Sequence, residues 1–299
     1  MEVLFIGVSS CIPEAGGDTA CFLINGRHPS GGCGSSAAAL LVDTGWRGAL
    51  GLRELGVDPV SVESVVLTHL HQDHYLWSFL HCSGTSHNAR NSSAQSVTLL
   101  QEILLYYGCH RNTRESVGLP QMLFYRAMCA PRPQAPLRII GPAEHLEEVV
   151  ASAMGFLQVG RFPELQVELE VVGLRPDDEC DVGGIRLHTC AARHVSGTGV
   201  PEPSLSWRAT ETNTGAALAF SGDTSYNPDL AQLARGVHTI IHDAAHSNGR
   251  EAAQVAQDAG AARLFLIHYD RQSGQRILEE ARRVFPESYL AEAGQRVTV

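Results

Sequence analysis

The sequence has no lysine, so all 22 basic side chains are arginines, against 32 acidic residues and a formal net charge of −10. Tight, sequence-tolerant binding of nucleic acid depends on neutralising phosphates with basic side chains. The composition therefore does not favour a nucleic-acid partner, although the charge of one surface can differ from the total.

Long apolar runs are also missing. No stretch approaches the roughly 20 residues that a membrane-spanning helix needs, and the start MEVLFIGVSS lacks the basic segment of a secretory signal. The eight cysteines show no Cys-x-x-Cys spacing, which argues against a zinc ribbon. We expect a cytoplasmic protein with buried or idle thiols and no membrane contact.

Short apolar runs bounded by turn residues alternate with helical patterns along the chain. Strands are predicted over residues 2–8, 20–25, 36–43, 64–69, 165–174, 183–193, 215–223, 237–243 and 262–270. Helices are predicted over residues 44–56, 227–236, 248–260 and 274–285. This mixed order predicts an α+β fold, a four-layer αββα sandwich, with residues 1–299 forming a single domain.

The composition changes over residues 81–136. This segment opens with a polar stretch, continues through VTLLQEILLYY with apolar residues at helical spacing, and ends in APRPQAP. We predict a helical insertion within the domain. It follows the metal-binding motif described next, so three uses stay open: a lid over the site, a homodimer face, or packing against the body.

Metal-ligating side chains are crowded in VVLTHLHQDHYLW, residues 65–77. Side chains two apart at a strand end point the same way, so His69 and His71 can converge on one ion. Asp73 and His74 follow on the next turn and can face a second ion. Imidazole nitrogens with carboxylate oxygens form a zinc-type ligand set, with manganese or iron as alternatives.

Further candidates follow apolar runs at the ends of predicted strands, where catalytic groups tend to gather. They are His194, Asp223, His246 and His268. Together with HLHQDH, the order of SGDT, HSNGREAA and LIHYD resembles the metallo-β-lactamase superfamily, and within it the ribonuclease Z-like branch. LRIIGPAEHLEEVV and SLSWRATE are similar to segments of that branch. The resemblance extends over nearly the whole chain except residues 81–136.

The resemblance implies a hydrolase with two divalent metal ions. It implies that the first ion is held by His69, His71 and His194. It implies that the second is held by Asp73, His74 and His268, with the Asp223 carboxylate bridging both. Two divalent cations lower the pKa of a shared water and outweigh two aspartates, so an anionic substrate is attracted to the site.

The prediction about the type of reaction depends on His246. The resemblance implies that this histidine sits beside a substrate phosphate and assists the leaving oxygen, and that Asp73 doubles as a proton acceptor. The motif departs from the branch by placing Asn248 where threonine is usual. The alternative for His246 is that it only caps the following helix, while His242, upstream on the strand, is expected to be structural.

We therefore expect a dinuclear metal-dependent phosphodiesterase that acts on a small or cyclic nucleotide-like ester. Transfer-RNA-processing members of the branch carry a protruding basic arm, whereas the corresponding residues 151–193 are compact and partly acidic here. Alternatives are a hydrolase of a carbonyl substrate such as a lactone, β-lactam or thioester, and a ribonuclease Z-type RNA endonuclease. An inactive metal-binding scaffold and a mononuclear iron oxygenase are weaker alternatives.

Overall fold

The computed structural model describes residues 1–13, 17–25, 39–70, 118–130, 135–195 and 199–299. Its strands form two seven-stranded sheets. The first sheet runs, in spatial order, β14 (Arg296–Thr298), β1 (Glu2–Gly7), β2 (Cys21–Asn25), β3 (Ala39–Val42), β4 (Val62–Val66), β5 (Leu137–Pro142) and β6 (Leu169–Leu174). The second runs β13 (Ser288–Leu290), β12 (Arg263–Ile267), β11 (Thr239–Asp243), β10 (Ala217–Phe220), β9 (Leu205–Glu211), β8 (Ile185–Ala191) and β7 (Glu179–Val182).

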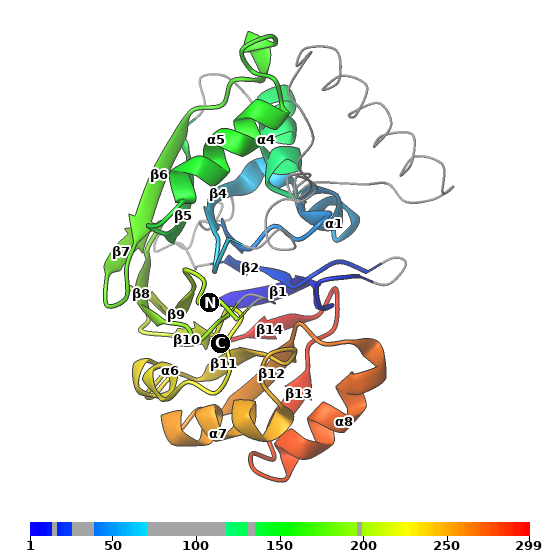
Figure 1. The fold of residues 1–299 in the computed structure, drawn as a ribbon, viewed down its shortest axis with the longest axis vertical. Coiled ribbons are helices and arrows are strands. Elements are labelled where there is room, and N and C mark those ends of the chain that lie inside the picture. Colours follow the sequence, from blue (N-terminus) through cyan, green and yellow to red (C-terminus); the bar gives the residue numbers. More distant parts are fainter. Residues whose placement is uncertain (14–16, 26–38, 71–117, 131–134, 196–198) are drawn as a thin grey trace, which may run out of the picture.

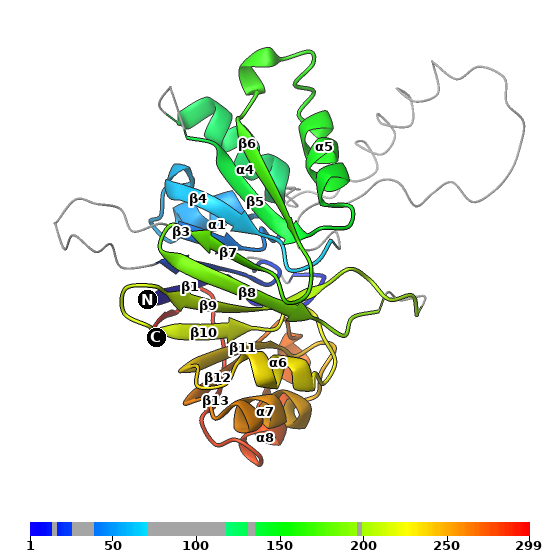
Figure 2. The same cartoon turned by 90° about the vertical axis from the view of Figure 1, so that its left-hand side faces the viewer.

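Helices cover the outer face of each sheet. The first sheet carries α1 (Gly48–Glu54), α4 (Gly118–Cys129) and α5 (Leu146–Phe156), and the second carries α6 (Pro228–Leu233), α7 (Gly249–Ala259) and α8 (Arg271–Arg282). Figure 1 shows the helical layers above and below the stacked sheets, and Figure 2 shows the same stack from the side. The predicted four-layer αββα sandwich is confirmed.

The layers follow from the alternation of side chains along the strands. In β1, Val3 and Phe5 belong to the core between the two sheets, whereas Leu4 and Ile6 belong to the core beneath α1, α4 and α5. Neighbouring side chains of a strand point to opposite faces, so a strand between two apolar layers must be apolar at every position. A third core, rich in alanine, joins the second sheet to α6, α7 and α8.

The predicted elements agree with the structure in most places, and their boundaries differ by up to four residues. The strand predicted over residues 165–174 begins only at Leu169, after the short 3-10 turn Pro163–Leu165 and the irregular residues 166–168. The last helix begins at Arg271 rather than at residue 274. The start of the strand predicted over residues 36–43 lies outside the described residues.

Most of the predicted insertion, residues 81–117 and 131–134, lies outside the described residues. Its remaining helix, α4, packs against the body through Leu119, Met122 and Leu123, which are buried in the first outer core. Gly118 permits this approach, because a Cβ there would lie 2.1 Å from the carbonyl oxygen of Gly45. The lid and the dimer face stay predictions for the rest of the segment.

None of the helices in the described part of the chain is both long and apolar enough to span a bilayer.

Candidate metal centre

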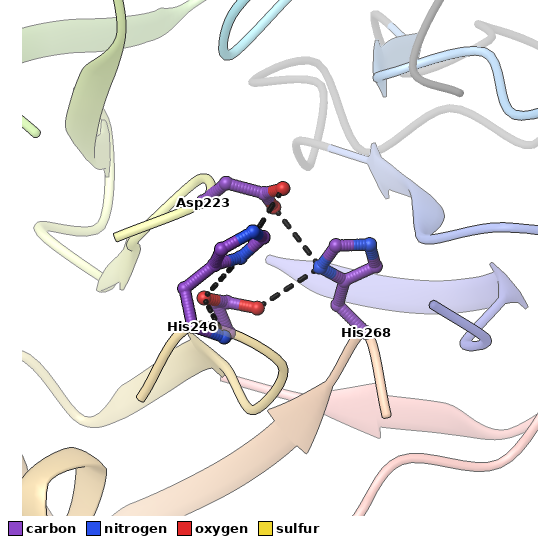
Figure 3. Close-up of side chains that lie close together, drawn as sticks. Asp223, His246 and His268 are labelled. Carbon is purple, nitrogen blue, oxygen red and sulfur yellow. Dashed lines mark hydrogen bonds and ion pairs between the residues drawn. The ribbon is translucent and has the colours of Figure 1, made fainter. Parts of the chain in front are cut away.

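The described candidate residues meet at one edge of the sandwich. The candidates follow the carboxyl ends of different strands: His69 after β4, His194 after β8, Asp223 after β10, His246 after β11 and His268 after β12. Since β10, β11 and β12 are parallel neighbours, the loops that follow them open on the same edge. Figure 3 shows Asp223, His246 and His268 turned toward one another.

Asp223 lies at the centre of this cluster and is 3% exposed. Its Oδ2 lies 3.6 Å from Nε2 of His69, and its Oδ1 lies 3.2 Å from Nδ1 of His268. The preceding Gly222 has a φ of +58°, and a Cβ there would lie 2.9 Å from the Leu205 carbonyl oxygen. The glycine of the SGDT motif thus lets the chain turn where a side chain would clash.

The imidazole rings form a nearly continuous row. The centroids of His69 and His194 lie 4.9 Å apart, those of His194 and His246 4.7 Å, and those of His246 and His268 5.5 Å. His69, His194 and His268 are buried, whereas the His246 side chain is 37% exposed. The row therefore has one member that a substrate can reach from solvent.

The backbone of His268 is held in a strained conformation. Its φ is +62°, in the left-handed region that is unfavourable for a residue with a side chain. The N–H of His268 donates to the carbonyl oxygen of Val8 at 2.8 Å, which ties the strained residue to the first sheet. Backbone strain at a non-glycine residue is common at functional sites.

Asp243, which is not among the residues predicted from the sequence, also belongs to the centre. This residue ends β11, is 1% exposed, and accepts from Nδ1 of His268 at 2.9 Å and from Nδ1 of His246 at 3.1 Å. The backbone N–H of Ala245 also donates to its Oδ1 at 2.9 Å. Its place at the end of the predicted strand 237–243 is the signal that marks it, as it marks Asp223.

The buried carboxylates and the histidines change one another's proton affinity. Burial and the charge of Asp223 raise the pKa of Asp243, but hydrogen bonds from His246 and His268 outweigh them and leave it below its usual value. Burial lowers the pKa of His246, but the hydrogen bond and charge of Asp243, with the charge of Asp223, leave it raised.

His242, upstream on the strand, does not belong to the row of imidazoles at the metal centre. It is fully buried, burial lowers its pKa, and its Nδ1 donates to the carbonyl oxygen of Asp243 at 2.8 Å. These contacts agree with the structural role expected for it.

The sequence-predicted residues fall into two sets. One set lies close together in the structure, although its members follow strands as far apart in the sequence as β4 and β12. It consists of His69, His194, Asp223, His246 and His268. His71, Asp73 and His74 lie outside the described residues, so their place at the centre stays a prediction.

The donor atoms fit divalent metal ions. Imidazole nitrogens and carboxylate oxygens of His69, His194 and Asp223 all lie within 4.8 Å of one another, as do those of Asp223, Asp243, His246 and His268. Ligands about 2.1 Å from a tetrahedral zinc ion are about 3.4 Å apart, close to the 3.6 Å between His69 and Asp223. Asp223 belongs to both groups, as a bridging ligand would.

The families that this chain resembles agree with the geometry of the candidate metal centre. The family model described as the metallo-β-lactamase superfamily matches residues 20–93, and the β-lactamase superfamily domain model matches residues 124–269. The chain belongs to the metallo-β-lactamase superfamily. This is a hydrolase family whose members bind divalent metal ions, as the donor groups above would allow.

Proteins named as ribonucleases are among those that are similar to this chain over its full length. Ribonuclease BN of Escherichia coli K12 is 26% identical over 331 aligned residues, covering 97% of both chains. Human tRNase Z, short form, has a TM-score of 0.66 at 17% identity and covers 100% of this chain and 99% of its own. The metallo-β-lactamase fold protein YhfI of Bacillus subtilis has a TM-score of 0.64 at 18% identity and covers 99% and 98%.

Proposed function

We propose that this metallo-β-lactamase-family hydrolase is a phosphodiesterase with two divalent metal ions, acting on a small or cyclic nucleotide-like ester. The observation that carries the proposal is His246. It is the exposed member of the row of imidazoles, and both buried carboxylates hold its Nδ1: Asp243 at 3.1 Å and Asp223 at 3.5 Å.

The arrangement orients His246 for proton transfer. Because a carboxylate only accepts, Nδ1 of His246 carries the proton that is donated to Asp243, and the opposite ring nitrogen, Nε2, is left to meet the substrate. Because the two carboxylates leave the pKa of His246 raised, the ring can also carry a proton on Nε2, and this imidazolium proton can pass to an oxygen that leaves phosphorus. Helix capping, the alternative role, falls to another residue, since Asn248 and Glu251 form the capping box of α7.

The metal ions would be held by the residues grouped above. We propose His69, His194 and Asp223 for one ion, with His71 as predicted from the sequence. We propose Asp223 and His268 for the other, with Asp73 and His74 as predicted, and zinc as the metal, with manganese or iron as alternatives. When bound, such ions polarise the phosphoryl group and lower the pKa of water. Asp73 is proposed to accept a proton during the reaction.

The test measures the turnover of three substrates by one protein sample whose metal content is also determined. Turnover of bis(p-nitrophenyl) phosphate is expected to exceed turnover of a lactone and of a chromogenic β-lactam. His246→Ala is expected to lose most phosphodiesterase activity, about 100-fold or more for a general acid. His188→Ala, on the outer face of β8, is the matched control. A phosphodiester that stays inert while a carbonyl ester is cleaved would support the carbonyl hydrolase instead.

A ribonuclease Z-type RNA endonuclease is the second candidate, because the full-length relatives include proteins named ribonuclease BN. The same chemistry would serve both substrates. Cleavage of a precursor transfer RNA, measured beside the small phosphodiester, separates them: rapid, site-specific RNA cleavage favours the endonuclease.

A further inference from the structure

A short chain of hydrogen bonds reaches Nδ1 of His69, the ring nitrogen opposite the Nε2 that faces Asp223. Asp43 is 4% exposed, Thr68 is 2% exposed and His69 is fully buried. Oδ1 of Asp43 accepts from the backbone N–H of Thr68 at 2.9 Å, and Oδ2 accepts from the Thr68 hydroxyl at 3.0 Å. The same hydroxyl oxygen lies 3.1 Å from Nδ1 of His69.

The direction of these bonds follows from the donor inventory. A carboxylate can only accept, so the single proton of the Thr68 hydroxyl is directed to Asp43. The hydroxyl oxygen can then only accept from His69, which requires the proton of the neutral ring on Nδ1. The lone pair is thereby left on Nε2, the atom that lies 3.6 Å from Oδ2 of Asp223.

We propose that Asp43 and Thr68 are positioning residues that fix the tautomer and ring orientation of His69, so that Nε2 faces the metal. The effect on metal binding rests on the proposed metal centre, whereas the tautomer of His69 follows from the hydrogen bonds alone. Fixing a ligand histidine through its second nitrogen is a general way of raising metal affinity.

The fold places Asp43 for this role. It follows β3, which pairs in parallel with β4, and its own N–H donates to the carbonyl oxygen of Val66 at 2.7 Å. Its φ is +53°, a conformation that aspartate and asparagine tolerate better than most residues. Asparagine can therefore replace Asp43 without a new backbone strain.

Asp43→Asn is expected to reverse the chain of bonds. The amide oxygen must face the Thr68 N–H, because two donors cannot pair, so the amide NH2 group faces the Thr68 hydroxyl. The hydroxyl oxygen then accepts from Asn, and its proton turns to Nδ1 of His69. The favoured tautomer becomes the one with the proton on Nε2, which cannot bind a metal.

The measurement is the tautomer of His69 in metal-free, full-length protein labelled with ¹⁵N-histidine. The His69 signals are assigned by their loss in His69→Ala. We expect the Nδ1–H form in the unmodified chain, the Nε2–H form in Asp43→Asn, and a mixture in Thr68→Val, which removes the hydroxyl at constant shape. Thr68→Ser, which keeps the hydroxyl, should retain the Nδ1–H form.

Zinc affinity is measured on the same variants by competition with a chromophoric chelator. Asp43→Asn and Thr68→Val should bind zinc about 10- to 100-fold more weakly, while Thr68→Ser stays near the unmodified protein. Asp58→Asn, at the exposed start of a 3-10 turn, is the matched control for the aspartate change.

An unchanged tautomer in both Asp43→Asn and Thr68→Val would overturn the proposal. Equal loss of affinity in Thr68→Ser and Thr68→Val would also overturn it, because Thr68→Ser keeps the hydroxyl and the loss could then not be due to the hydroxyl alone. If Asp43→Asn does not fold, the two Thr68 variants decide. A protein that shows the expected tautomers but leaves phosphodiesters intact would refute the proposed reaction alone.

Discussion

Asp18 offers a quantitative test of how burial controls the charge of a carboxylate. It is 4% exposed and accepts from the backbone N–H groups of Thr19 at 2.9 Å, Trp46 at 2.8 Å and Arg47 at 3.0 Å. It thereby tethers the loop after β1 to the turn that follows Asp43. Burial raises the pKa of Asp18 to about 6 and outweighs these hydrogen bonds, which lower it.

The raised pKa predicts that the carboxylate form of Asp18 destabilises the fold. The folded value of about 6 exceeds the unfolded value of 3.8, so the folded state binds the proton more tightly. The contribution of Asp18 to the free energy of unfolding is then highest below pH 3.8. It falls as the pH rises toward 6 and is level above that. A shift of about 2 pKa units corresponds to a fall of about 3 kcal/mol.

The assay is urea unfolding of metal-free protein between pH 4 and pH 7, for the unmodified chain and for Asp18→Asn, which cannot titrate. The difference in the free energy of unfolding, unmodified minus variant, should fall by about 2.4 kcal/mol over this range, because the rest of the change lies below pH 4. Asp181→Asn, at an exposed position of β7, is the matched control. A difference that is constant or that rises with pH would refute the dominance of burial over the three hydrogen bonds.

Other predictions concern the helical layer and the metal. Gly249→Ala should lower the free energy of unfolding by about 1–3 kcal/mol in urea melts, because its Cβ would lie 2.0 Å from the carbonyl oxygen of Ile277 in α8; an unchanged midpoint would contradict the close packing of α7 on α8. Asn248→Ala removes the capping box of α7 and should cost about 1 kcal/mol, whereas Asn248→Ser should cost little. Removal of metal by a chelator should lower the melting temperature, with a loss of about 2.7 kcal/mol when free metal had been at 100 times its Kd; a variant carrying Asp223→Asn should respond much less.

Secondary structure and most candidate ligands could be predicted because their signals are local. The strand that ends before Asp223 and the helix that starts after Asn248 are visible in apolar runs, glycine turns and caps over ten residues or fewer. Parallel strands bring their carboxyl ends to one edge, so Asp223 and His268, which follow β10 and β12, could be expected to meet once the strands were recognised. The local pattern also explains the error at Leu169, where a proline turn replaces the first part of an apolar run.

The sequence by itself determined the elements of the sandwich and the chemical types that gather at its edge, because apolar periodicity and strand-end side chains are encoded residue by residue. Only the tertiary structure decided that Asp243 holds His246 and His268, and that Asp43 holds Thr68 behind His69. Asp243 ends a strand, Asp43 directly follows one, and each binds a side chain on a neighbouring strand or in an adjoining loop. Such a role depends on which strands are paired and in what register, which a pattern within one segment does not contain.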